Sequence, residues 1–183
     1  MPPTASTSSA RRVTTTALLA ALLAASAAIS IPFGTVPVTL QILALVLIAL
    51  TVPRSWAAFA VGVYLLVGAV GLPVFSGMRG GLGVLTGPTG GYLLGFLVAA
   101  PVGAWVRGAL AGRSASTGVA DSVAAAAVIA IVYVIGWAQL ALVTGMTPIA
   151  ALLAGVMPFV VPDALKAIAA VLLAPMVRRA ASV

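Results

Sequence analysis

Two charged residues near the C-terminus, Asp163 and Lys166, are the strongest candidates for chemistry in this sequence. They stand three residues apart in the apolar stretch VMPFVVPDALKAIAAVLLAPMVRR. That spacing is close to one helical turn, so both side chains fall on the same face of a helix. If the stretch crosses a membrane, an ionisable pair there indicates a binding or transport site. The alternative is a self-neutralising pair that only orients the helix.

The rest of the composition removes most other chemistry. The 183 residues include no histidine, no cysteine and only two acidic residues. General acid–base catalysis, nucleophilic catalysis, disulfides and histidine or cysteine metal sites therefore lack their usual side chains. We expect a protein that is not an enzyme and needs no cofactor or metal. The alternative from another class is an intramembrane enzyme that uses Asp163 and Lys166.

The chain is 63% hydrophobic and 6% charged, whereas soluble domains are about a quarter charged. Most of its apolar blocks are near the ~17–25 residues that cross a bilayer as a helix, and none alternates as barrel strands do. We predict an all-α integral membrane protein, a bundle of six transmembrane helices formed by a single domain of residues 11–183 behind a disordered tail of residues 1–10. The six blocks are residues 13–31, 38–52, 56–72, 89–106, 119–143 and 164–177.

Basic residues predict the orientation, because cytoplasmic loops are enriched in Lys and Arg. With both termini in the cytoplasm, seven of the nine fall on the inner side: Arg11, Arg12, Arg54, Arg107, Arg113, Arg178 and Arg179. The net charge of +7 is scattered rather than gathered in a stripe with aromatics, which argues against nucleic acid as a partner. The start RRVTTTALLAALLAASAA also fits a cleavable signal peptide, which would leave five spans.

The first block has alanines at four-residue spacing, which places them in rows along a helix. One row is Ala17, Ala21 and Ala25, and the other is Ala20, Ala24 and Ala28. Small residues let two membrane helices approach closely. Packing inside the bundle and contact with a partner are both open interpretations.

A single helix over residues 149–177 would measure about 43 Å, which exceeds a ~30 Å hydrocarbon core. Pro158 and Pro162 predict a break, with residues 149–161 as a membrane-embedded or surface segment. Pro162 is then the first helical residue, and Asp163 lies in the first turn, where the helix dipole favours an acid. Lys166 opposes that dipole, and an anionic ligand would compensate it.

Two loops on the predicted outer side complete the candidate site. Residues 71–95 hold nine of the nineteen glycines and also Arg79, the one basic residue of the outer loops. Such backbone predicts either a pocket wall or an ordinary flexible loop. The first outer loop, IPFGTVPVTLQ, places Thr39 and Gln41 near the outer surface and predicts either a lid or a tight connection. No segment has a Walker-type phosphate loop, so active transport would need an ATPase on another chain.

Three separated motifs, VPVTLQ, GAVGLPVFSGMRGGLGVLTGPTGGYLLGF and PFVVPDALKA, occur in this order. Together they resemble the BioY family, the biotin-binding substrate components of energy-coupling factor transporters, over residues 18–170. The resemblance implies six helices in a bacterial cell membrane that bind biotin from outside. It also implies a transmembrane coupling subunit and two cytoplasmic ATPases that use ATP as partners. A substrate component for another vitamin or small anionic solute is the alternative within this class.

The resemblance also implies roles for individual residues. Asp163 and Lys166 match the polar pair of the last helix, which is expected to hydrogen-bond the vitamin. The alanine rows correspond to the surface offered to the coupling subunit. Where relatives use an amide in the glycine-rich loop this chain has none, and Arg79 is the substitute that we expect. The pocket motif of the fourth helix is matched by Gly87, Gly90, Gly91 and Tyr92.

Overall fold

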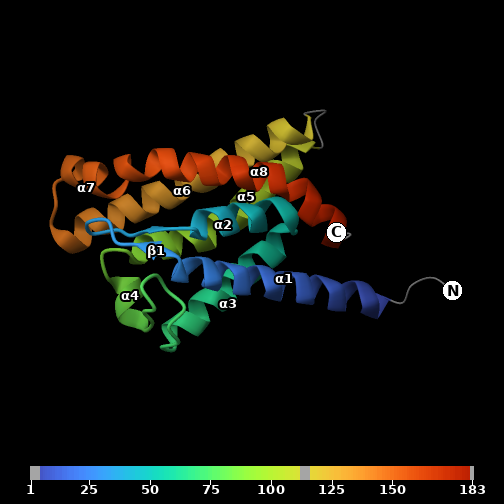
Figure 1. Ribbon diagram of the computed structural model, residues 1–183, viewed down its shortest axis with the longest axis horizontal. Coiled ribbons are helices and arrows are strands. Elements are labelled where there is room, and N and C mark those ends of the chain that lie inside the picture. The colour runs from blue at the N-terminus through green and yellow to red at the C-terminus, as the bar shows by residue number, and fades with distance from the viewer. Residues whose placement is uncertain (1–4, 112–115, 182–183) are drawn as a thin grey trace.

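The computed structural model describes residues 5–111 and 116–181 (Figure 1), and it is a bundle of helices with one short hairpin. The elements in chain order are α1 (Ala5–Ala28), β1 (Ser30–Ile31), β2 (Val38–Thr39), α2 (Gln41–Thr51), α3 (Arg54–Ala69), α4 (Leu82–Thr86), α5 (Gly90–Ala111), α6 (Thr117–Thr144), α7 (Pro148–Gly155), the 3-10 turn η1 (Met157–Phe159) and α8 (Val160–Ala181).

The described part of the chain contains helices that correspond to all six predicted apolar blocks. Three helical stretches are long and apolar enough to cross a membrane: Gly90–Ala111, Thr117–Thr144 and Pro148–Ala180. The shorter apolar helices are Val13–Ala28, Gln41–Thr51 and Arg54–Ala69. The predicted all-α membrane bundle is therefore confirmed.

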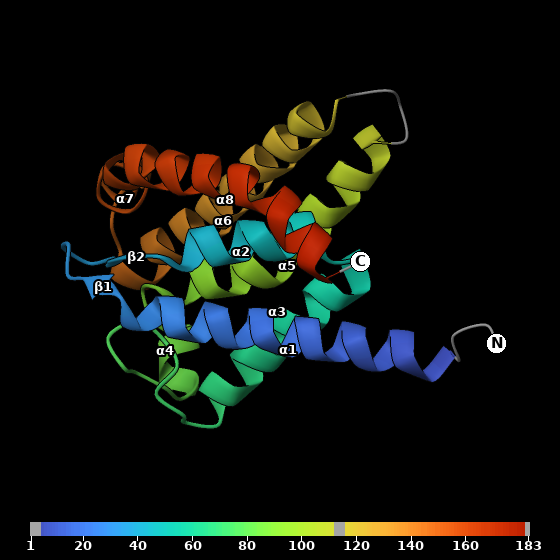
Figure 2. The ribbon, with the colours of Figure 1, turned by 45° about the vertical axis from the view of Figure 1, so that its right-hand side comes forward.

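The helices run back and forth between two ends of the bundle (Figures 1 and 2). Both chain ends lie at one end, which we call the terminal end. The β1–β2 hairpin, α4 and α7 lie at the other, which we call the distal end. Arg79 precedes α4 at the distal end, whereas α3 begins at Arg54 and α8 carries Arg178 and Arg179 in its last turn. The basic side chains thus separate as the positive-inside prediction requires, although the orientation in a bilayer remains a prediction.

Helix α2 lies in the centre of the bundle (Figure 2), between α1, α5, α6 and α8. Ten of its eleven residues are buried. At about 1.5 Å per residue it is too short to span a bilayer alone. Its apolar side chains therefore face protein rather than lipid, and it serves as the core against which the longer helices pack.

Helices α5 and α6 pack closely because glycine replaces a side chain at their contact. A Cβ added at Gly91 would lie 2.6 Å from both the Ile135 carbonyl oxygen and the Gln139 Cβ. Real Cβ atoms do not come this close to other heavy atoms, so only glycine permits this approach.

The second acidic residue, Asp121, connects three helices near the terminal end. Its carboxylate, 1% exposed, accepts from Arg107 Nε of α5 at 2.7 Å and from Arg178 Nη2 of α8 at 2.9 Å. Arg178 Nη1 also donates to the carbonyl of Leu50 in α2 at 3.0 Å. Four helices therefore meet in one hydrogen-bonded network. Throughout the described residues, every buried side-chain nitrogen and oxygen atom has a hydrogen-bond partner.

Two boundaries differ from the prediction. Helix α1 begins at Ala5, within the segment 1–10 for which we predicted a disordered tail; residues 1–4 lie outside the described residues. The break before the last helix is confirmed, but α8 begins at Val160 rather than at Pro162. The turn η1 leads directly into α8, and Pro162 is tolerated because first-turn amides have no intrahelical acceptor.

Candidate functional site

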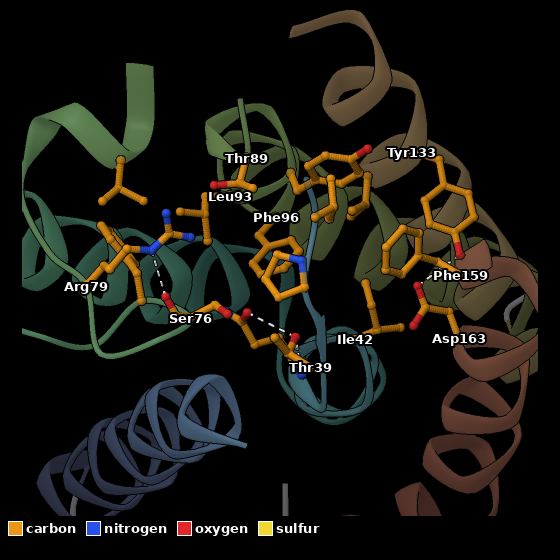
Figure 3. A pocket seen from close by; sticks show the side chains of 17 residues that line it. Thr39, Ile42, Ser76, Arg79, Thr89, Leu93, Phe96, Tyr133, Phe159 and Asp163 are labelled. Carbon is orange, nitrogen blue, oxygen red and sulfur yellow. Dashed lines mark hydrogen bonds between the residues drawn. The ribbon is translucent and has the colours of Figure 1, made fainter. Parts of the chain in front are cut away.

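A cavity of about 620 Å³, counting its open mouth, lies at the distal end (Figure 3). Its walls come from the hairpin, α2, the loop before α4, α4 and the turn after it, η1, and helices α5, α6 and α8. The lining residues are Val36, Pro37, Thr39, Gln41, Ile42, Phe75, Ser76, Arg79, Val84, Thr89, Tyr92, Leu93, Phe96, Val132, Tyr133, Phe159 and Asp163.

At one end of the cavity, Asp163 is held by hydrogen bonds on both carboxylate oxygens. The Tyr133 hydroxyl donates to Oδ2 at 2.9 Å, and Lys166 Nζ donates to Oδ1 at 2.7 Å. Asp163 is 4% exposed, and it faces the cavity with Tyr133. Lys166 does not line the cavity, and its ion pair neutralises Asp163 and fixes the orientation of the carboxylate.

Arg79 lies at the opposite side of the cavity (Figure 3). Its Nε donates to the carbonyl of Ser76 at 3.0 Å, and its backbone pairs with Phe75 across a tight turn. No carboxylate pairs with Arg79 among the residues that the structure describes. The guanidinium is therefore held by its loop and left available to an anion at the cavity.

Gln41 and Thr39 also line the cavity, and hydrogen bonds within the protein already occupy their polar groups. The Thr39 hydroxyl donates to Gln41 Oε1 at 3.1 Å, and Gln41 Nε2 donates to the buried Tyr64 hydroxyl at 2.8 Å. Gln41 is 4% exposed. Its place in the wall is thereby fixed before any ligand binds.

The hairpin is joined to the rest of the site at two points. The hydroxyls of Ser30 and Ser76 share a hydrogen bond of 2.7 Å. Phe33 packs edge-on against Phe159, with ring centroids 6.2 Å apart. The hairpin is therefore part of the cavity wall.

Tyr92 contributes its ring to the cavity, but its hydroxyl points elsewhere. The hydroxyl donates to the carbonyl of Gly155, at the end of α7, over 2.7 Å. The ring passes over Gly136, where a Cβ would clash with it. Tyr92 therefore braces α7 against α5 and α6.

The glycines of the pocket motif lie behind the wall rather than on it. Gly87, Gly90 and Gly91 are absent from the lining, whereas Thr89 between them is present. A Cβ at Gly90 would lie 2.7 Å from Gln139 Nε2. These glycines shape the site by letting backbone segments approach each other.

The two alanine rows of α1 face different surroundings. In one row Ala20 is buried, Ala24 is partly buried against the bundle and Ala28 is exposed, while Ala17, Ala21 and Ala25 of the other row are all exposed. Ala20 and Ala24 therefore pack within the protein, and the row of Ala17, Ala21 and Ala25 is available to lipid or to another protein.

Sequence reasoning missed Tyr133 and the aromatic side chains Phe75, Phe96 and Phe159. Tyr133 carried a usable signal, because a tyrosine in the middle of an apolar span buries its hydroxyl only where it finds a partner. The phenylalanines carried none, since they resemble any core or lipid-facing residue.

Comparison with known proteins agrees with this geometry. The family model described as "BioY family" matches residues 2–183. The probable biotin transporter BioY of Pyrococcus horikoshii is 35% identical over 148 residues, 81% of this chain and 84% of that protein. The biotin transporter BioY of Thermotoga maritima is 49% identical over 90 residues, 49% of this chain and 51% of the relative.

A solved structure has the same fold. It is the S-component for biotin from an ECF-type ABC transporter, with a TM-score of 0.86 and 22% identity, and the match covers 96% of this chain and 93% of that one. At this identity the likeness establishes the helix arrangement alone.

Proposed function

Since the chain belongs to the BioY family, we propose that it is the biotin-binding component of a vitamin uptake transporter. It is a multi-pass cell membrane protein, and its family and relatives are transporters rather than enzymes. The observation that carries the proposal is the distal cavity. Polar groups lie at its opposite sides, and apolar and aromatic side chains line the cavity between them.

This arrangement suits biotin, which has a ureido ring at one end and a carboxylate at the other. The N–H groups of a neutral ureido ring need hydrogen-bond acceptors, which the Asp163 carboxylate and the Tyr133 hydroxyl oxygen provide, since the Tyr133 proton is itself donated to Asp163. A carboxylate needs a cation, which Arg79 provides. The apolar middle of the cavity, with Ile42, Leu93 and Phe96, suits the aliphatic chain between them. We therefore place the ring at Asp163 and the carboxylate at Arg79.

A binding titration of the purified chain tests the function. Labelled biotin is expected to bind saturably and to be displaced by unlabelled biotin but not by thiamine or riboflavin. Displacement by either of those vitamins would instead support a substrate component for another solute. The absence of saturable binding would reject the proposal.

Arg79→Gln is expected to weaken biotin binding by about ten- to a hundredfold, because a hydrogen bond to a charged group contributes ~1.5–3 kcal/mol. The control is a biotin amide, which has no carboxylate and should bind wild type and variant alike. Titration of both ligands checks this. An equal loss for the two ligands would place the carboxylate elsewhere.

Uptake also needs partners, and we propose a transmembrane coupling subunit and two cytoplasmic ATPases. The exposed alanine row of α1 is the surface that we assign to the coupling subunit, because small side chains permit close helix contact. The exposure of Ala17, Ala21 and Ala25, with Ala20 and Ala24 of the other row turned inward, supports this assignment.

Ala21→Trp is expected to reduce copurification with the coupling subunit severalfold, since the bulky ring holds the two helices apart. Biotin affinity should not change, because Ala21 is remote from the cavity lining. Leu172→Trp, at a residue of α8 that is 70% exposed, is the matched control and should leave the yield of complex unchanged. A full yield with Ala21→Trp would reject this surface.

A further inference from the structure

Gln139 of α6 makes a pair of contacts that the proposed function does not use. Its side-chain amide Nε2 donates to the carbonyl of Leu85 at 2.8 Å and to that of Gly87 at 2.9 Å. Both carbonyls belong to the end of α4 and the turn that leads into α5. A single amide thus binds two backbone oxygens on a segment more than fifty residues away in sequence.

The segment that Gln139 holds packs against the core through Val84 and Leu85 but makes few other side-chain hydrogen bonds to the rest of the protein. Helix α4 has five residues, none of them buried and no side-chain cap. Helices this short are not stable alone. The Thr86 hydroxyl bonds only to Leu82 and Gly83 of the same helix. Among the described residues, Gln139 supplies the side-chain hydrogen bonds that this turn receives from another element.

The same segment forms part of the cavity wall. Val84 and Thr89 line the cavity on either side of the carbonyls that Gln139 binds. In Figure 3, Thr89 lies near Leu93 on the side of the cavity that holds Arg79. A shift of the turn would therefore move the wall beside the proposed carboxylate position.

The paired glycines of the pocket motif lie directly against the contacts that Gln139 makes. A Cβ at Gly90 would clash first with the Leu85 carbonyl, the group that Gln139 binds, and would also lie 2.7 Å from Gln139 Nε2. One at Gly91 would lie 2.6 Å from both Gln139 Cβ and the Ile135 carbonyl oxygen. Glycine at these positions therefore lets the turn and α6 approach closely enough for the amide to reach its two carbonyls.

From these contacts we propose that Gln139 is a positioning residue for biotin binding. Without touching the ligand, it fixes the α4–α5 turn so that Val84 and Thr89 hold their places in the wall. The inference rests on the proposed function. We call the two hydrogen bonds from Gln139 to the turn the amide clamp.

Gln139→Leu tests the proposal, since leucine fills similar space without a donor. Biotin affinity is expected to fall on the order of tenfold, because a buried carbonyl that loses its donor is unfavourable and the turn relaxes to expose it. Hydrogen exchange of the ligand-free variant should rise over residues 82–89 and stay unchanged over α2 and α8. Trp137→Phe is the matched control. It removes another side-chain bond of α6, from Trp137 Nε1 to the Pro148 carbonyl, and should alter neither result.

Combining Gln139→Leu with Thr89→Val shows whether Gln139 positions the cavity wall or only stabilises the fold. If Gln139 acts through the wall, the two substitutions are non-additive, and Thr89→Val costs little in the Gln139→Leu background. Additive losses, unchanged exchange over residues 82–89, or raised exchange with unaltered affinity would each overturn the proposal. Failure of the wild-type chain to bind biotin would reject the function instead, while the exchange measurement, which needs no ligand, would still test the clamp.

Discussion

Lys166→Ala is expected to weaken biotin binding by at least about thirtyfold. Removing one member of a buried, hydrogen-bonded charge pair costs ~2–5 kcal/mol, much of it for the charge left behind. That charge is Asp163, which is 4% exposed and bonded to Lys166 Nζ at 2.7 Å. Titration of the purified variant with labelled biotin measures the loss.

A double variant shows whether this loss concerns the ligand or only the fold. Asp163→Asn with Lys166→Met leaves no stranded charge and keeps similar volumes. We expect the double variant to fold and to have a melting temperature closer to that of wild type than the Lys166→Ala variant has. It should still bind biotin poorly, because the carboxylate acceptor is absent. Wild-type affinity in the double variant would assign the pair a structural role alone.

Asp121→Asn is expected to have the largest effect on stability and almost none on affinity. It leaves Arg107 and Arg178 without their shared carboxylate, and breaking a buried ion pair costs ~3–5 kcal/mol. The melting temperature in detergent should fall accordingly. Asp121 lies near the terminal end, remote from the cavity lining, so the biotin affinity of the folded fraction should be unchanged.

Neighbouring arginines supply the control for this network. Arg178→Gln should reproduce much of the destabilisation, because Arg178 bonds both Asp121 and the Leu50 carbonyl. Arg179→Gln should not, since Arg179 is exposed and has no ion pair within the described ranges 5–111 and 116–181. Equal melting temperatures for all three variants and wild type would show that the network contributes nothing to stability.

The features that depend on local sequence could be predicted. Hydropathy gave the six apolar helices, and two prolines gave the break before the last one. The three-residue spacing of Asp163 and Lys166 predicted a contact on one helix face, and the two groups are 2.7 Å apart. Each of these inferences needs only residues within a few turns of each other.

Features that depend on distant residues could not be predicted. Tyr133 meets Asp163 across thirty residues, and Asp121 meets Arg178 across fifty-seven. Periodicity divided the α1 alanines into two rows but did not say which row faces the bundle. Tyr92 was assigned to the pocket motif from the sequence, but only the packed structure shows its hydroxyl reaching α7. Helix packing decides these contacts, and no local pattern encodes it.

The burial of α2 shields one wall of the ligand site from changes in the thickness of the surrounding bilayer. Membrane helices that touch lipid tilt or shift when the hydrocarbon layer becomes thicker or thinner. Gln41 and Ile42, which line the cavity, stand on a helix whose neighbours are almost all protein. Changes in lipid composition would therefore be absorbed by the outer faces of α5, α6 and α8. The part of the cavity wall that α2 contributes would keep its shape when the hydrocarbon layer becomes thicker or thinner.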